Sequence, residues 1–325
     1  MAKLKLILAC SELDRTRPLI AGSIEAEGIE LSCVCLPPRE IFARMLRSQE
    51  FDVSELGLAY YIIVKARGEC PFVAIPVMLS RFFRHSCIFV NVDAGIEKPE
   101  DLAGKRVGVP DYAQTAGVFI RGMLHHDYSV RAEDVLWYWR PPKGAPQGTL
   151  VSLSVSERIR LEPLPPDKNL DDMLVAGELD AIATPYLPDP FLRGSPKVRR
   201  LFPNFKEVEK EYYLRTRIFP IMHLVVVRRD IYEQHPWVAR SLYDAFTKAK
   251  ERALSILYEA DTLKVSLPWL IDHIEESRAV FGPDLWPYGL EPNRPTLEAA
   301  AQYVVEQGLT DRKVVVDELF APETL

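Results

Sequence analysis

The sequence predicts an α/β fold divided into two lobes, and three observations support this. Short apolar runs typical of strands alternate with helical patterns over most of the chain, as in folds built on largely parallel sheets. The 325 residues exceed the usual size of a single hydrophobic core. The chain also leaves its first block of strands and later returns to strand-like sequence at His223–Arg228. We therefore expect two lobes joined by two crossovers, with a ligand cleft between them.

The expected strands are short apolar or alternating runs, in the order Lys5–Ala9, Ile29–Leu36, Val73–Val77, Arg106–Val109, Asp180–Thr184 and Leu224–Arg228. The expected helices carry apolar residues at helical spacing and follow these strands. They are Pro38–Arg47, Thr115–Leu124, Leu170–Ala176, Pro236–Glu259 and Leu297–Gln307.

Turn-rich segments suggest where the lobes divide. The polar segment Glu97–Arg106 separates the first block of strands from a new strand, and three prolines between Pro188 and Pro196 precede the return. We assign residues 1–95 and 219–325 to a discontinuous lobe I, and residues 96–218 to lobe II.

Composition restricts the partners of the protein. The net charge of -6, with 48% hydrophobic and 26% charged residues, is ordinary for a globular protein and lacks the basic excess of nucleic-acid binders. No apolar stretch is long enough to cross a bilayer, and no signal sequence precedes the strand at Leu4–Leu8. The five cysteines form no CxxC pair, and their odd number disfavours a disulfide framework. We expect a cytoplasmic protein with neither nucleic acid nor membrane as partner; a homo-oligomer is possible.

The segment PVMLSRFFRHSCIFVN (Pro76–Asn91) places Arg81, Arg84 and His85 between two apolar, strand-like runs. Cations are costly to bury there unless an anion meets them. Two guanidinium groups and an imidazole can hold a carboxylate and transfer a proton. The alternative is a solvated loop, or arginines that pair with acidic residues of the protein itself.

Further polar residues follow expected strands, where ligands of open α/β lobes collect. These candidate binding residues are Ser11, Arg15, Arg17, Tyr60, Thr115 and Tyr186. Thr115 stands at an expected helix start, where free N–H groups attract anions, although it can equally cap the helix. For Asp111 we expect the capping role.

The sequence contains none of the common metal or cofactor motifs. HExxH, the phosphate-binding P-loop, GxGxxG and GxSxG are all missing. The adjacent histidines His125 and His126 do not share the helix face that a two-histidine metal site needs. We therefore expect no metal and no organic cofactor.

Several motifs occur in the order found in a known fold. These motifs are KPEDLAGKRVGVPDYAQTAG (Lys98–Gly117), GELDAIATPYLPDPF (Gly177–Phe191) and HLVVVRRDIYEQHPWVARSLYDAF (His223–Phe246). They resemble, in that order, the crossover into the second lobe, the closing strand of that lobe and the return into the first lobe in type II periplasmic-binding proteins. A narrower resemblance is carried by four segments, FDVSELGLAYYI (Phe51–Ile62), PVMLSRFFRHSCIFVN, VGVPDYAQTAGVFIRGML (Val107–Leu124) and FPIMHLVVVRRD (Phe219–Asp230). Through them the whole chain resembles the 4,5-dihydroxyphthalate decarboxylase family.

This resemblance implies non-oxidative decarboxylation of a hydroxylated aromatic dicarboxylate, most simply 4,5-dihydroxyphthalate to protocatechuate and carbon dioxide. It makes His85 and His223 the acid/base candidates, although either histidine can instead be structural. Arg81 and Arg84, with Arg15 or Arg17, are expected to hold carboxylate. Two alternatives remain on the same fold: a solute-binding protein for an organic anion, and a lyase resembling menaquinone-pathway enzymes.

Overall fold

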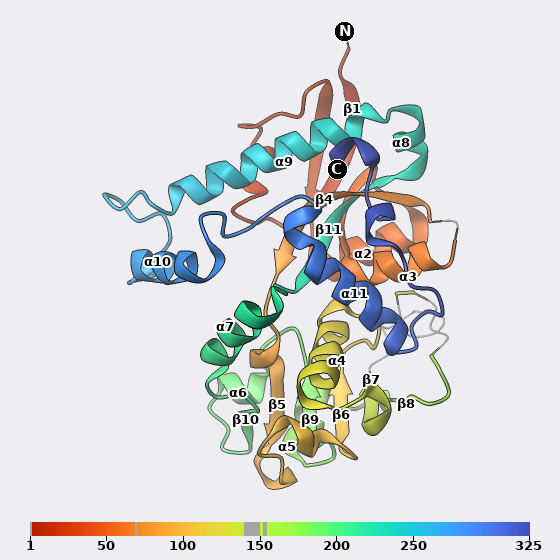
Figure 1. Ribbon diagram of the computed structural model, residues 1–325, viewed down its shortest axis with the longest axis vertical. Coiled ribbons are helices and arrows are strands. Elements are labelled where there is room, and N and C mark those ends of the chain that lie inside the picture. Colours follow the sequence, from red (N-terminus) through yellow and green to blue (C-terminus); the bar gives the residue numbers. More distant parts are fainter. Residues whose placement is uncertain (1, 69, 140–149, 152–154) are drawn as a thin grey trace.

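The protein, described by a computed structural model over residues 2–68, 70–139, 150–151 and 155–325, consists of two lobes, each built on one sheet (Figure 1). In the first sheet β1 pairs in parallel with β2 and β3, and β11 runs antiparallel to β3 and β4. The strand order is β2 (Ile29–Cys35), β1 (Leu4–Cys10), β3 (Val53–Gly57), β11 (Ile221–Arg228) and β4 (Phe72–Arg81). The late strand β11 thus lies between two early strands, as the predicted return of the chain requires.

The second sheet combines a parallel part with an antiparallel edge. Its order is β10 (Val198–Arg200), β5 (Ile88–Asn91), β9 (Ala181–Ala183), β6 (Arg106–Val109), β7 (Leu136–Trp139) and β8 (Arg160–Pro163). β6 pairs in parallel with β7 and β9, whereas β5 runs antiparallel to β9 and β10.

The pairing of β5 shows that the chain first crosses between the lobes earlier than expected. Because β5 belongs to the second sheet, the chain leaves the first sheet at Phe82–Cys87, before the boundary expected after residue 95. Within this crossing lies a single 3₁₀ turn, η1 (His85–Cys87). The chain returns through α7 (Phe205–Thr216) into β11.

Helices cover the two sheets and one of them joins the lobes. Besides α7, the helices are α1 (Arg17–Ile20), α2 (Pro38–Ser48), α3 (Leu58–Ala66), α4 (Thr115–Tyr128), α5 (Leu170–Val175), α6 (Asp189–Leu192), α8 (Arg229–Gln234), α9 (Trp237–Ile256), α10 (Leu270–Phe281) and α11 (Arg294–Glu306). α11 packs against both α3 and α4. A Cβ atom at Gly122 would lie 2.1 Å from the Tyr303 ring, so only glycine lets α4 approach α11 this closely.

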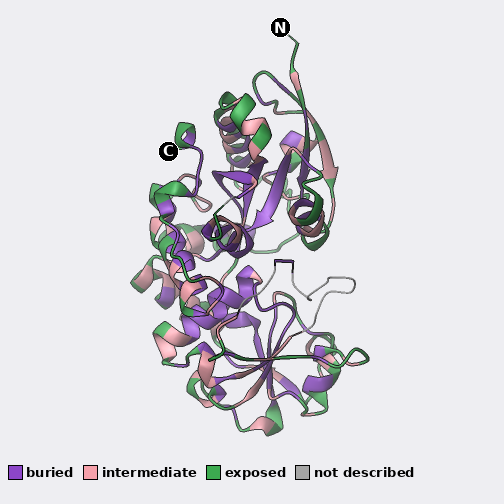
Figure 2. Cartoon of the chain, turned by 90° about the vertical axis from the view of Figure 1, so that its right-hand side faces the viewer, coloured by how far each residue is buried: buried purple, intermediate pink, exposed green. Residues whose placement is uncertain are grey.

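Buried residues concentrate in the two sheets (Figure 2). All five residues of β3 are buried, including Ser54 and Glu55. A buried carboxylate needs a partner, which draws attention to this strand. Among the described residues, no helix is both long and apolar enough to cross a membrane.

Candidate active site

A cavity of about 470 Å³ lies between the lobes, a size within the usual range of small-molecule pockets. The first sheet and its helices contribute Pro37, Pro38, Arg39, Phe42, Tyr60, Ser80, Phe82, Arg84, Met222 and His223. Elements of the second lobe contribute Pro110, Asp111, Gln114, Thr115, Ala116, Leu150, Pro185 and Tyr186. The expected ligand cleft is therefore present, and we call it the interlobe cleft.

His223 lies near the start of β11, where the pairing with β4 is irregular. The register shifts on both sides of His223, and such irregularities re-aim side chains near functional sites. Its Nδ1 lies 2.6 Å from Oε1 of Glu55, and the Phe42 ring meets the imidazole edge-on with centroids 4.9 Å apart. Since Nδ1 is engaged by the carboxylate, Nε2 is the nitrogen that can serve a ligand in the cleft.

Glu55 lies in the middle of β3, where it contacts His223 but does not itself line the cleft. Its Oε2 accepts a hydrogen bond from the backbone N–H of Ser11 at 2.7 Å. Burial alone would raise the pKa of Glu55, but the hydrogen bonds and charge from His223 and Ser11 outweigh it and hold the pKa below its ordinary value. Glu55 is thus a carboxylate that orients the His223 imidazole through Nδ1.

Arg84 is a buried cation on the cleft wall that is not paired with a carboxylate in the described chain. Its Nε donates to Met222 Sδ at 3.2 Å and its Nη1 to Cys87 Sγ at 3.5 Å, while the guanidinium lies 4.9 Å from the centroid of the Phe82 ring. Burial lowers the pKa of Arg84. Sulfur atoms are weak acceptors, so this guanidinium retains most of its capacity to bind an anion.

Arg39 is a second cation of the cleft, and the sequence analysis did not single it out. It occupies the first turn of α2, after Pro37 and Pro38, and its side chain is exposed. Cations are disfavoured at a helix N-terminus because of the helix dipole. This cost is small for an exposed side chain, so the local sequence does not distinguish Arg39 from an ordinary surface arginine.

Asp111 and Tyr60 link the lobes at the cleft. The Tyr60 hydroxyl donates to Asp111 Oδ2 at 3.0 Å, and the backbone N–H of Ala113 donates to Oδ1 at 2.8 Å. Asp111 therefore closes a local turn and does not cap α4, contrary to expectation. Burial raises the pKa of Asp111, and burial together with the Asp111 carboxylate raises that of Tyr60. An aspartate with a raised pKa is a better proton acceptor.

Thr115 also connects the lobes. Its Oγ1 accepts a hydrogen bond from the backbone N–H of Ala59 at 3.1 Å, so it satisfies a free N–H at the start of α3 across the cleft. Tyr186, 46% exposed, lines the opposite wall.

His85 does not reach the cleft wall. It lies in the turn η1, and the rings of Phe202 and Tyr212 meet it edge-on at 5.3 and 5.2 Å. Burial, aided by the charge of Arg215, lowers the pKa of His85 to about 4. Its imidazole is therefore neutral near pH 7, which makes it a poor proton donor.

The guanidinium of Arg81 forms hydrogen bonds within the protein and does not face the cleft. Its guanidinium donates to the carbonyl oxygens of Phe219 and Pro287 and to Asn293 Oδ1. It is buried and ties the end of β4 to the C-terminal region, away from the cleft wall.

The three expected residues after β1 also lie off the cleft wall. Ser11 supports Glu55 through its backbone N–H. Arg15 donates to the carbonyl oxygen of Leu79, and Arg17 forms an exposed ion pair with Glu12 at 3.3 Å. Proximity in sequence to the end of a strand does not fix which way a loop directs its side chains.

In the described part of the chain, one group of three side chains has metal-ligand spacing, and it lies outside the cleft. Glu306 Oε2 lies 2.8 Å from His126 Nε2 and 3.5 Å from His125 Nδ1. These three side chains are partly or largely solvent-accessible. Both imidazoles thus contact the same carboxylate oxygen, and none of the three side chains lines the cleft.

Comparison with known proteins defines the class of the fold. The chain matches a periplasmic sulfonate-binding protein of Methylobacillus flagellatus with a TM-score of 0.57 at 15% identity, covering 100% of this chain and 93% of the other. The aliphatic sulphonate binding protein of Escherichia coli matches with a TM-score of 0.54 at 15% identity, over 98% and 92%. Residues 28–143 match the family model of the ABC-transporter phosphonate periplasmic substrate-binding protein. The protein has a type II periplasmic-binding-protein-like fold.

Sequence relatives then define the family. The chain is 37% identical over 325 residues to 4,5-dihydroxyphthalate decarboxylase of Comamonas testosteroni, covering 100% of this chain and 98% of that protein. The enzyme of the same name from Pseudomonas putida is 36% identical over 213 residues, 66% of this chain and 83% of that protein. The chain belongs to the 4,5-dihydroxyphthalate decarboxylase family.

Proposed function

We propose that the protein is a carboxy-lyase that converts 4,5-dihydroxyphthalate to protocatechuate and carbon dioxide without a redox step. The observation that carries this proposal is the His223–Glu55 pair, which faces the same cleft as the cations Arg84 and Arg39. A proton donor and an anion clamp are the two elements that this reaction needs.

The substrate chemistry explains why these groups suffice. Direct loss of carbon dioxide from an aryl carboxylate would leave a very basic aryl carbanion. In 4,5-dihydroxyphthalate each carboxylate is para to a hydroxyl group, which can push electron density toward the carboxyl-bearing carbon. Protonation of that carbon, with loss of the para hydroxyl proton to a base, gives a cyclohexadienone-like intermediate. Its C–C bond to the carboxylate then breaks, and carbon dioxide leaves. The ring becomes aromatic again as a phenolate, which takes back the proton from the base. No metal or organic cofactor is required.

We assign the roles as follows. The Nε2–H group of His223 supplies the proton to the ring carbon, and Glu55 holds the imidazole in this orientation. Arg84, with Arg39, binds the carboxylates. Asp111, beside Tyr60, accepts the proton of the phenol hydroxyl and later returns it, because burial raises the pKa of Asp111. His85, Arg81, Arg15, Arg17 and Ser11 support the protein around the site, and Thr115 and Tyr186 complete the walls.

We infer a cytoplasmic location from the thiols. All five cysteines are free, as is usual in a reducing compartment. Assembly into a homo-oligomer stays a prediction.

The first test is carbon dioxide release after exhaustive chelation. We expect the purified protein to release carbon dioxide from 4,5-dihydroxyphthalate at the same rate before and after chelator treatment, because proton transfer and charge stabilisation come from side chains. Phthalate, which lacks the para hydroxyl groups, is the control and should release none. Activity that disappears with chelator and returns with one divalent ion would contradict the proposal. Tight binding without conversion would support a solute-binding protein, and conversion of purine-nucleoside-derived compounds would support a menaquinone-pathway-like lyase.

A further inference from the structure

The strand β4 contains an irregular stretch beside the interlobe cleft. His223 of β11 stands opposite Ser80, but Val225, two residues on, stands opposite Ile75. The segment Pro76–Leu79 therefore faces Leu224 alone and departs from the regular ladder. We call this segment the β4 bulge. Buried carbonyl groups in such a bulge need other hydrogen-bond donors.

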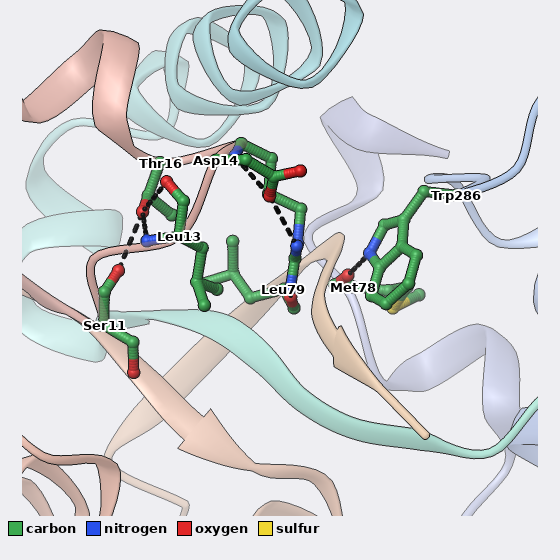
Figure 3. A network of polar contacts seen from close by, with 8 residues as sticks. Ser11, Leu13, Asp14, Thr16, Met78, Leu79 and Trp286 are labelled. Carbon is green, nitrogen blue, oxygen red and sulfur yellow. Dashed lines mark hydrogen bonds and ion pairs between the residues drawn. The ribbon is translucent and has the colours of Figure 1, made fainter. Parts of the chain in front are cut away.

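Side chains and backbone from distant parts of the chain supply these donors. Arg15 Nε donates to the Leu79 carbonyl at 2.6 Å, and its Nη2 donates to the same oxygen. Trp286 Nε1 donates to the Met78 carbonyl at 2.7 Å, and the backbone N–H of Gly289 donates to the Pro76 carbonyl at 2.8 Å. Figure 3 shows the Leu79 and Met78 carbonyls between the loop after β1 and the Trp286 indole.

Arg15 and Trp286 also contact each other. The guanidinium carbon of Arg15 lies 4.3 Å from the centroid of the Trp286 ring, and Arg15 Nη1 pairs with Asp14 at 2.8 Å. Both side chains line a separate cavity of about 280 Å³ and not the interlobe cleft. The contact of Arg15 with the cleft therefore runs through the backbone of β4.

The β4 bulge is placed where it can control the site. It directly precedes Ser80, Phe82 and Arg84, which line the cleft, and it lies opposite the β11 residue next to His223. A shift of the bulge would move the Arg84 guanidinium and the His223 imidazole together. Small displacements of such groups are costly in binding and catalysis.

We propose that Arg15 and Trp286 are positioning residues, which hold the β4 bulge and thereby set Arg84 and His223 for the substrate. This inference rests on the proposed function in one respect, namely that Arg84 binds a carboxylate of an aromatic diacid. It assigns Arg15 a role different from the direct carboxylate contact that the sequence suggested.

The test is a double-mutant cycle on binding of phthalate, an aromatic diacid that the proposed chemistry leaves unconverted. The variants are Arg15→Ala, Arg84→Ala and the double variant, with Kd measured by calorimetry. We expect Arg15→Ala to weaken binding about tenfold, Arg84→Ala to weaken it about ten- to hundredfold, and the double variant to match Arg84→Ala within about twofold. Coupling of this size requires that Arg15 act through Arg84, which a general loss of stability does not produce.

Two further variants guard against loss of the fold. Trp286→Phe removes the donor to Met78 but keeps the ring beside Arg15, and Arg15→Lys keeps the charge but not the two-donor contact with Leu79. Each should weaken phthalate binding less than Arg15→Ala and lose its effect in the Arg84→Ala background. Arg44→Ala, a surface arginine of α2 paired with Glu50, should bind as the wild type does.

The outcomes separate this inference from the proposed function. Additive losses, or no loss in any Arg15 or Trp286 variant, would overturn the inference even if the wild type converts 4,5-dihydroxyphthalate. Coupled losses in a wild type that converts nothing would support the inference and overturn the proposed function. A wild type that does not bind phthalate would overturn the inference, whereas the proposed function is decided by conversion of 4,5-dihydroxyphthalate.

Discussion

Replacing His223 with alanine should lower kcat by about two to four orders of magnitude, the usual contribution of a positioned general acid. His223 is the cleft histidine whose Nδ1 is held by a buried carboxylate, so its Nε2–H is the proton source of the proposed reaction. KM should change far less, because the carboxylates of the substrate are held by other residues. Steady-state kinetics with 4,5-dihydroxyphthalate measure both constants.

His273→Ala is the matched control, since this histidine is exposed on α10 and should keep wild-type turnover. If His223→Ala retains near-native kcat while remaining folded, the assignment of the proton donor is wrong. A loss of turnover in His85→Ala alone would instead favour the histidine of η1.

Replacing Arg84 with alanine should chiefly weaken binding, by about ten- to hundredfold, because charge-assisted hydrogen bonds to one carboxylate are lost. Arg84→Lys should lose less, since the charge stays but the planar, two-donor geometry does not. The measurement is KM with 4,5-dihydroxyphthalate together with Kd for phthalate. Unchanged values of both constants would show that the anion binds elsewhere in the cleft, and Arg44→Ala again serves as the surface control.

Much of the fold could be predicted because periodicity reports local structure. The expected strand at Arg106–Val109 has the bounds of β6, and the expected helix at Pro38–Arg47 lies within α2. The lobe boundary could not be predicted as well. The apolar run Ile88–Asn91 has no feature that assigns it to one sheet or the other, and its pairing with β9 and β10 places it in the second lobe.

The site was less predictable because side-chain direction depends on tertiary structure. Arg84 and His85 are adjacent in sequence, yet the turn η1 directs His85 into a cluster of aromatic rings while Arg84 lines the cleft. Glu55 does carry a signal in the sequence, because a carboxylate inside the apolar run Val53–Leu58 needs a buried partner. Its partner, His223, is 168 residues away in sequence, so only the pairing of β3 with β11 reveals it.

The most direct test of the proposed function is the reaction of the purified protein with 4,5-dihydroxyphthalate in D₂O. Protonation of the ring carbon predicts equal amounts of carbon dioxide and protocatechuate, with one deuterium ortho to the retained carboxylate and para to the 3-hydroxyl group. His223→Ala should form this product far more slowly. A diacid that stays bound and unchanged in the wild type would contradict the account and identify the protein as a binding protein for organic anions.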